Sequence, residues 1–326
     1  MILALSNDND IGTMEVIRRE KDLKRSFANP VLTIGNFDGV HLGHRHIFQL
    51  LKQKAREIGG ESIVYTFEPH PVAVLAPEHK PLLITPLEEK LRLIAEQGMD
   101  MAILANFSDK FANQTPEDFV KKVLYDQVKI RQLFVGHDYT FGKDRRGNIA
   151  LLKELGRKLG FNVEVVEAVR VGGMVVSSTL IRELIQKGEL REAARLLGRN
   201  YLLSGQVIHG HGRGSRKLGF PTANVKAAGA LLPKPGIYAV WAIFEGKRYT
   251  AVANLGWNPT FHDQKFSIEV HILDFDRDIY GQPLRVEFVE RLRDEITFRG
   301  PDELVAQIKK DITQAKKVLS AADHKA

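Results

Sequence analysis

The 326-residue sequence contains no cysteine and no long apolar run. Without thiols the chain forms no disulfide and offers no thiolate to a metal, a composition compatible with a reducing compartment. No stretch approaches the roughly 20 apolar residues needed to span a bilayer. The apolar segment 1–5 is too short for a signal-peptide core and runs into the polar segment 6–10. We therefore expect neither a membrane span nor export, and we predict a cytoplasmic protein.

Aromatic residues make up 8% of the chain, and no aromatic-rich strip or long lysine–arginine run is present. The 47 Lys and Arg residues exceed the 40 Asp and Glu residues, which gives a net charge of +7. Such an excess suits nucleic acids and small polyphosphates equally well. Because the basic residues are dispersed, we predict polyphosphate ligands and no nucleic acid. A basic nucleotide- or RNA-binding module is the alternative from another functional class.

The length of the chain exceeds the usual range of one domain and predicts two. We place the first domain at residues 14–186 and the second at residues 187–326, and we treat residues 1–13 as a disordered extension. In the first domain, β-branched runs at VLTIG, SIVYTF, MAIL, QLFVG and VEVVEAV alternate with amphipathic stretches. This alternation predicts an α/β fold with a doubly wound parallel sheet. Ligands of such sheets bind at the carboxyl ends of strands, here the loops after Ile34, Phe67, Val135 and Val176.

The second domain has a different texture. After a short helical stretch at 189–197, strand-like runs occur at YLLSGQVI, GIYAVWAIF, RYTAVANLG, FSIEVHIL and LRVEFV. Their spacing, with Gly, Pro and Asn between them, predicts an antiparallel β-barrel. Apolar residues near helical spacing at 301–319 predict a terminal helix packed on that barrel.

The segment GNFDGVHLGH, residues 35–44, is named here the first phosphate loop. It follows a predicted strand and enters a predicted helix, so backbone N–H groups and the positive helix end face a bound anion. The chain has no GxxxxGK[ST] motif at this place, and His41 and His44 instead offer two imidazole donors for triphosphate oxygens. This pattern favours nucleotidyl transfer. A surface or helix-cap pair of histidines and a zinc site remain alternatives.

A second signal for a nucleotide site is SSTLIR, residues 177–182. It follows the strand-like run 174–176 and begins a predicted helix. Its hydroxyl groups can cap the helix, and Arg182 can clamp a phosphate. Taken alone, the segment is equally well explained as a helix cap.

Together with TFEPHP from residue 66 and VGHDYTFG from residue 135, these segments resemble the nucleotidyltransferase superfamily and, within it, the adenylyltransferase half of bacterial FAD synthetases. The resemblance covers residues 14–186 and implies adenylyl transfer from ATP to FMN. It implies catalytic roles for His41 and His44 at the ATP phosphates. The nucleotide-binding residues that it implies are Gly35, Asn36, Phe37, Asp38, Asp138, Ser177, Ser178, Thr179 and Arg182. The flavin-binding residues that it implies are Phe67, Pro69, His70 and Pro71.

A glycine-rich basic segment, residues 210–224, is named here the second phosphate loop. Its glycines make the backbone pliable enough for N–H groups to surround phosphates, and Arg213 adds positive charge. The glycines are Gly210, Gly212, Gly214 and Gly219. A mobile hairpin loop or an RNA-contacting loop is the alternative explanation.

The residues after these glycines suggest a metal site and a base. Thr222 and Asn224 in FPTAN offer neutral oxygens that suit a magnesium ion also held by substrate phosphates. The alternating segment SIEVHI predicts a strand with Glu269 and His271 on one face. A simple turn at FPTAN and a surface charge at Glu269 remain the alternatives.

Five segments in this half resemble, in order and spacing, the riboflavin kinase barrel: GHGRGSRKLGFPTANV, GIYAV, NLGWNPTF, IEVHILDFDRDIYG and VEFVERLRDEITF. The resemblance implies that Thr222 and Asn224 bind magnesium and ATP, and that residues 210–219 cover the nucleotide. It implies that Glu269 accepts the proton of the ribityl hydroxyl that attacks the γ-phosphate.

The order of the two halves resembles the bacterial enzymes that join both activities in one chain. This resemblance implies a multifunctional transferase of FAD biosynthesis, with riboflavin, FMN and ATP as small-molecule substrates and Mg²⁺ as cofactor. Since one fold serves many substrates, retention of only one of the two activities is a further alternative.

Overall fold

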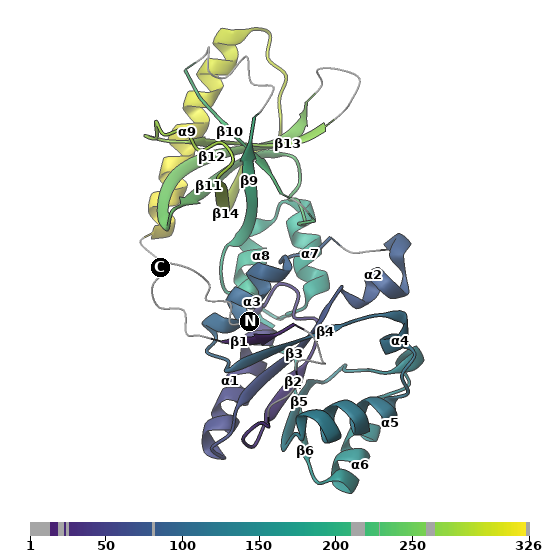
Figure 1. Cartoon of the computed structure of the whole chain (residues 1–326). Coiled ribbons are helices and arrows are strands. Elements are labelled where there is room, and N and C mark those ends of the chain that lie inside the picture. Colours follow the sequence, from purple (N-terminus) through teal and green to yellow (C-terminus); the bar gives the residue numbers. More distant parts are fainter. Residues whose placement is uncertain are drawn as a thin grey trace. The chain divides into compact units, whose positions relative to one another are not determined.

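The structure is a computed structural model that describes residues 14–18, 23, 26–79, 82–209, 219–227, 229–258 and 265–323. The chain forms two compact units: residues 1–82 with 86–177, and residues 83–85 with 178–326. Figure 1 labels the elements of both units. Residues 1–13, predicted to be a disordered extension, lie outside the described residues. So do residues 210–218 of the second phosphate loop, among them the predicted site residues Gly210, Gly212, Arg213 and Gly214.

Among the described residues, the first unit is built on a six-stranded sheet in the order β1-β4-β3-β2-β5-β6 (Figure 1). Every neighbouring pair is parallel, which confirms the predicted doubly wound α/β fold. The strands are β1 (Glu15–Ile17), β2 (Val31–Ile34), β3 (Ser62–Glu68), β4 (Met101–Asn106), β5 (Gln132–Gly136) and β6 (Asn162–Val166). The three residues of β1 were too short a run to be predicted as a strand.

Helices bury the sheet from both sides, which is why its central strands are almost continuously apolar. On one face, α1 (Leu42–Glu57) and α3 (Leu87–Glu96) pack Phe48, Leu51 and Ile94 against the strands. On the other face, the helix at Phe119–Val128, labelled η3, and α6 (Ile149–Leu159) supply Val120 and Leu152. The first phosphate loop connects β2 to α1 and therefore leaves the carboxyl end of a central strand.

The stretch 116–125, predicted from its amphipathic pattern, is helical but irregular. It starts as α5 (Pro116–Asp118) and continues as a π-helix over Phe119–Val128, which ends at Lys129 in the left-handed conformation with φ 57°. Long π-helices are rare, and the sequence pattern did not distinguish one from an α-helix. The remaining short helices of this unit are α2 (Pro71–Leu75), η2 (Pro77–His79), α4 (Asp109–Ala112) and η4 (Lys143–Arg145).

One strand prediction was wrong. The run 174–176 was expected to be a strand of the parallel sheet, with a ligand loop after Val176. Instead, β8 (Met174–Val175) pairs antiparallel with β7 (Arg170–Val171) in a separate two-stranded sheet, as far as the described residues go. Gly172 and Gly173, at φ 58° and 82°, form the turn between them. Two successive residues with positive φ favour a tight hairpin over continuation into a parallel strand.

The second unit begins inside the SSTLIR motif. It contains α7 (Ser178–Lys187), the helix expected to start there, and α8 (Leu190–Leu197), predicted at 189–197. Residues 83–85 join this unit through a bridge between Leu83 and Ala230 and a hydrogen bond from the Leu231 N–H to the Leu83 carbonyl. A domain boundary at 186/187 remains a prediction.

A closed barrel, of six strands in the described chain, confirms the predicted antiparallel fold of the second half (Figure 1). Neighbours around the barrel follow the order β10-β13-β12-β11-β14-β9 and all pair antiparallel. The strands are β9 (Tyr201–Ile208), β10 (Ala223–Lys226), β11 (Gly236–Phe244), β12 (Lys247–Asn258), β13 (Lys265–Ile272) and β14 (Pro283–Arg293). The short strand β10, which contains Asn224, was not predicted.

The terminal helix α9 (Pro301–Asp323) packs on the outside of the barrel, as the sequence predicted. Its buried residues Ala315 and Leu319 contact Trp241 and neighbouring side chains of β11 and β14. The first turns of α9 extend beyond this contact and wall a cavity described below.

Candidate active sites

The first phosphate loop contains backbone conformations that are unfavourable for residues other than glycine. Phe37 and Val40 adopt positive φ values of 50° and 39° although neither is glycine. Phe37 is buried and contacts Phe48 with a ring-centroid distance of 5.0 Å. Strained backbone of this kind is maintained only where surrounding contacts fix it, and it is frequent at functional sites.

His41 and His44 lie together at the start of α1. His41 is the N-cap residue, and its Nδ1 accepts a hydrogen bond from the His44 backbone N–H at 3.3 Å. The two rings stack with centroids 3.5 Å apart and an interplanar angle of 18°. A Cβ atom at Gly43 would lie only 3.2 Å from the His41 ring. Gly43 therefore leaves room for the His41 ring, and both imidazoles lie side by side at the amino end of a 16-residue helix.

The predicted flavin-binding residues lie at the carboxyl end of β3, where Phe67 is still part of the strand and the other three follow it. Phe67 contacts Phe107 and Phe111 at centroid distances of 5.5 and 5.7 Å. The Glu68–Pro69 bond is cis, and the helix α2 starts at Pro71. His70 caps that helix, because its Nδ1 accepts a hydrogen bond from the backbone N–H of Val72 at 3.3 Å.

The other predicted nucleotide residues are distributed over three segments. Asp38 lies in the first phosphate loop and is only 4% exposed. Asp138 is exposed in the turn after β5, the strand next to β2. Ser177 is the last residue of the first unit, whereas α7 of the second unit contains Ser178, Thr179 and Arg182.

Lys90 is a residue of the first site that the sequence analysis missed. It lies in α3, is 7% exposed, and its Nζ donates hydrogen bonds to the Asn36 carbonyl and to Thr66 Oγ1, each at 3.2 Å. Burial lowers the pKa of Lys90 to about 8, although Glu68 and Asp38 oppose this shift. A signal was available, because Lys90 occupies the apolar stripe of its helix between Leu87 and Ile94.

In the second unit, strand register brings three polar residues into one row. Asn224 of β10 and Asn254 of β12 both pair directly with Glu269 of β13. Directly paired residues on adjacent strands point to the same face. Because the alternate residues Ala253 and Val270 are fully buried inside the barrel, this row lies on the outer face. The predicted alternation that places Glu269 opposite to Val270 is confirmed.

Two residues of this row, Asn254 and Glu269, line a cavity of about 320 Å³ between the barrel surface and α9. Thr222, Asn254, Glu269 and His271 line its polar side. Apolar residues of α9 line the opposite side: Leu304, Ile308 and Ile312. A cavity with an apolar wall and a few convergent polar groups is the usual form of a small-molecule site.

A partly buried ion pair between β14 and α9 lines the cavity. Arg293 of β14 donates two hydrogen bonds to the Asp311 carboxylate of α9, at 2.9 and 2.7 Å, and Gln307 donates a third at 2.9 Å. Nearby, burial raises the pKa of Glu295, and a Cβ at Gly256 would clash with its carboxylate. These polar contacts fix the first turns of α9 against the strands.

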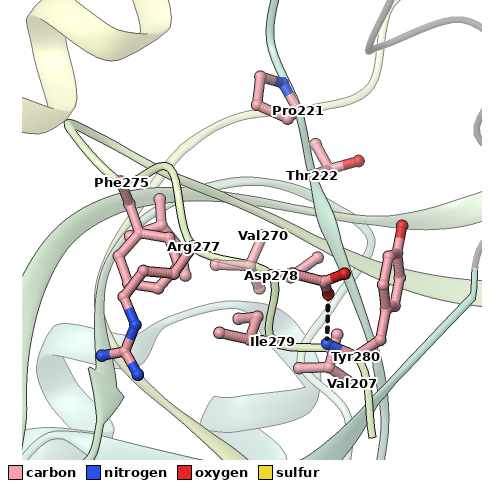
Figure 2. Close-up of a pocket in the computed structure, with 11 residues that line it drawn as sticks. Val207, Pro221, Thr222, Val270, Phe275, Arg277, Asp278, Ile279 and Tyr280 are labelled. Atoms are coloured by element: carbon pink, nitrogen blue, oxygen red, sulfur yellow. Dashed lines mark hydrogen bonds between the residues drawn. The ribbon is translucent and has the colours of Figure 1, made fainter. Parts of the chain in front are cut away.

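A smaller cavity of about 80 Å³ lies at the end of the barrel (Figure 2). Thr222 lines this cavity as well as the larger one. Figure 2 also shows Asp278, whose carboxylate accepts a hydrogen bond from the Tyr280 N–H at 3.0 Å. The Tyr280 ring stacks on His209 with centroids 3.9 Å apart. His209, the last described residue before the second phosphate loop, therefore lies beside a residue that lines the smaller cavity.

The FPTAN segment is anchored between the two cavities. His271 Nδ1 lies 2.7 Å from the Pro221 carbonyl oxygen. Because a carbonyl oxygen only accepts, Nδ1 carries the proton in this contact. Gly219 adopts φ 85°, a value that favours glycine. Thr222 thus has a defined place next to both cavities.

Comparison with known proteins assigns each half of the chain. The profile of the FAD synthetase family matches residues 23–180, and that of the riboflavin kinase family matches residues 197–319.

Curated relatives extend over nearly the whole chain, and all those cited here carry the name bifunctional riboflavin kinase/FMN adenylyltransferase. The Haemophilus influenzae protein is 37% identical over 304 residues, covering 93% of this chain and 98% of that protein. The Escherichia coli K12 protein is 39% identical, with 86% and 90% covered. The Bacillus subtilis protein is 37% identical, with 93% and 96% covered.

A solved structure shows that the fold is shared over the same length. The crystal structure of a Streptococcus pneumoniae protein, named a macrolide-efflux protein, matches with a TM-score of 0.83 and 31% identity, covering 93% of this chain and 98% of that one. The name of that protein differs from those of the curated relatives. In the part of this chain that the structure describes, no helix is long and apolar enough to span a bilayer.

The two family profiles and the near-complete coverage of the curated relatives lead to one assignment: the chain belongs to the bifunctional riboflavin kinase/FMN adenylyltransferase family.

Proposed function

We propose that this chain phosphorylates riboflavin to FMN with ATP and then adenylylates FMN to FAD with release of pyrophosphate. The observation that carries the proposal is the presence, in one chain, of two matched families with a distinct site in each half. The first unit supplies a histidine pair at a helix start, and the second supplies a carboxylate in a cavity. We assign adenylylation to residues 14–186 and phosphorylation to residues 187–326, in the cytoplasm.

For the kinase step, two cavities meeting at Thr222 suit two substrates. The larger has the apolar wall that a flavin ring requires, and the smaller is lined by Pro221 and Thr222 near the end of the second phosphate loop. Glu269 accepts the proton of the riboflavin hydroxyl as that oxygen attacks the γ-phosphate of ATP and ADP leaves. One P–O bond forms, between the riboflavin oxygen and the γ-phosphorus, and one P–O bond breaks, between the γ-phosphorus and the oxygen of the departing ADP.

The magnesium ion required by this proposal fits the residues present. Mg²⁺ is usually held by one or two protein oxygens together with substrate phosphates. Thr222 lines both cavities, and Asn224 pairs with Glu269 across the strands. We propose that these two residues hold the ion, which neutralises phosphate charge when bound.

For the adenylyl step, the FMN phosphate is itself the nucleophile. A phosphate monoester has a second pKa of about 6 and is largely a dianion at neutral pH, so no strong base is needed. The oxygen of FMN attacks the α-phosphorus of ATP and pyrophosphate leaves. We propose that His41, His44 and backbone N–H groups of the first phosphate loop stabilise the phosphate charge. Ser177, Ser178, Thr179, Arg182 and Asp138 complete the proposed nucleotide site.

A time course tests this function directly. Purified protein is incubated with riboflavin, ATP and Mg²⁺, and riboflavin, FMN and FAD are separated by chromatography with fluorescence detection. We expect FMN to rise first and FAD to follow. FMN alone would leave only the kinase activity. No product from riboflavin or from added FMN would contradict the proposal and favour a nucleotide-binding module.

A further inference from the structure

Lys90 occupies a position where a charge needs an explanation. Lysine is almost never fully buried unless its charge is paired, yet Lys90 is 7% exposed within α3. Its neighbours in the helix, Leu91 and Ile94, belong to the apolar core of the sheet face. A leucine or methionine at position 90 would satisfy the helix pattern equally well.

The contacts of Lys90 join three segments. Its Nζ donates to the Asn36 carbonyl in the first phosphate loop and to Thr66 Oγ1 in β3, each at 3.2 Å. Thr66 Oγ1 in turn donates to the same Asn36 carbonyl at 3.3 Å. The three groups form a closed triangle beneath the loop, and the Asn36 carbonyl accepts two of its three hydrogen bonds. Hydrogen bonds to charged groups are stronger than neutral ones.

The folded core does not favour a charged side chain at position 90. Burial lowers its pKa to about 8, so the ammonium is disfavoured there relative to water. The charged groups that face it are Asp38, in the first phosphate loop, and Glu68, at the end of β3. Replacing a buried charge by an apolar residue of similar volume is often neutral or stabilising. A role in the loop explains the lysine better than stability does.

We propose that Lys90 is a positioning residue for adenylyl transfer, which holds the first phosphate loop through the Asn36 carbonyl and so places His41 and His44 at the phosphates. This inference rests on the proposed function. Asn36 lies next to Phe37, whose backbone has a positive φ and must be fixed by its surroundings. Loss of such an anchor displaces catalytic groups, and a displacement of about 1 Å can reduce a rate by about 100-fold.

The test uses full-length Lys90→Met and Lys90→Arg with FMN as the supplied substrate. We expect Lys90→Met to lower kcat of FAD formation by about 100-fold, with a smaller change in KM for ATP. Lys90→Arg, which keeps the charge and donors, should recover at least about tenfold of that loss. The kinase activity of the same chain should stay at the parental rate in both variants, which shows that the second unit is intact, and a parental circular dichroism spectrum and unfolding transition show that the first unit is folded.

Lys52→Met is the matched control. Lys52 of α1 also donates from Nζ to a backbone carbonyl, that of Gln97, at 3.2 Å, but this bond does not reach the first phosphate loop. We expect its FAD formation to match the parent. Equal losses in Lys52→Met and Lys90→Met would overturn the proposal, as would parental FAD formation by Lys90→Met.

A pH profile of the parent adds a readout that needs no variant. If the ammonium form is required, kcat of FAD formation falls as pH rises through about 8, where Lys90 deprotonates beside Asp38 and Glu68. In Lys90→Arg this decline should move to higher pH, because guanidinium keeps its proton. A parental profile that stays flat to pH ~10 would contradict the proposal. A parent that makes no FAD at any pH would instead contradict the proposed function.

Discussion

The two proposed sites offer ATP different kinds of side chain, and the proposed nucleophiles explain the difference. The first site offers imidazoles, backbone N–H groups at a helix start and a buried ammonium. The second offers the Glu269 carboxylate beside neutral oxygens. A phosphate dianion attacks without losing a proton, whereas a ribityl hydroxyl must lose one. In this account, only the second site needs a base.

The two units also build their sites by different means. In the parallel sheet, the first site lies at the carboxyl ends of adjacent strands, and loops carry its residues. In the barrel, cross-strand pairing aligns Asn224, Glu269 and Asn254 on one outer face, and α9 supplies the opposite wall. The geometry of the first site therefore depends on the positions of its loops. The geometry of the second site depends on the packing of α9 against the barrel.

Removal of the proposed base should have the largest effect. We expect Glu269→Gln to lower FMN formation from riboflavin by about 10³-fold, because the hydroxyl loses its proton acceptor. FAD formation from supplied FMN should remain at the parental rate. Glu290→Gln is the control, since Glu290 pairs with Arg191 and lines neither cavity. Both steps measured separately by chromatography decide the outcome, and parental FMN formation would exclude Glu269 as the base.

The reciprocal change in the first site should be nearly as large. We expect His44→Ala to lower FAD formation by about 10²-fold through loss of charge stabilisation, while FMN formation continues. His46, exposed two residues along the same helix, provides the control variant His46→Ala. Similar FAD rates in the two variants would show that the histidine pair acts only as a helix cap.

A moderate effect on the kinase step is expected from shortening a side chain of α9 that lines the larger cavity. Ile308→Ala removes apolar contact surface from the larger cavity. We expect KM for riboflavin to rise by about tenfold, with kcat of the kinase step little changed. Val318→Ala, which packs against the helix–barrel core away from the cavity, should leave KM unchanged. A parental KM in Ile308→Ala would place the flavin elsewhere.

Outside catalysis, the expected effect is a pH-dependent gain in stability. Lys90 has an ordinary pKa of 10.5 and a folded pKa lowered to about 8. Between these values the unfolded chain binds more protons, so stability rises with pH across that window. The full gain is on the order of 3 kcal/mol. Denaturant unfolding of the parent and Lys90→Met, each from pH 7 to 10.5, measures it as their difference. If the free energy of unfolding changed equally with pH in both proteins, the lowered pKa of Lys90 would be contradicted.

Much of the fold was predictable from pattern alone. The runs YLLSGQVI and GIYAVWAIF became β9 and β11 with the predicted limits, because strand-like runs of eight or nine residues bounded by Gly, Pro and Asn are a strong signal. The strands that were missed, β1, β7 and β10, have three, two and four residues, too few for a period to be recognised. The hairpin at Gly172 and Gly173 shows that local turn geometry can override a strand-like run.

The sites were predictable only in part. HxGH spacing indicated a helix start with two imidazoles, since that arrangement depends on residues close in sequence. The contacts of Lys90 with Asn36 and Thr66 span 54 and 24 residues, and the cavity wall joins α9 to strands far earlier in the chain. Such contacts depend on tertiary packing, which periodicity does not encode.

A complementation experiment tests most directly whether one chain carries two independent active sites. Glu269→Gln and His44→Ala are each given riboflavin, ATP and Mg²⁺, alone and mixed. The account predicts almost no FMN from the first variant, FMN without appreciable FAD from the second, and FAD from the mixture, because one protein makes the FMN that the other consumes. A mixture that produces no more FAD than either variant alone would contradict two separable sites.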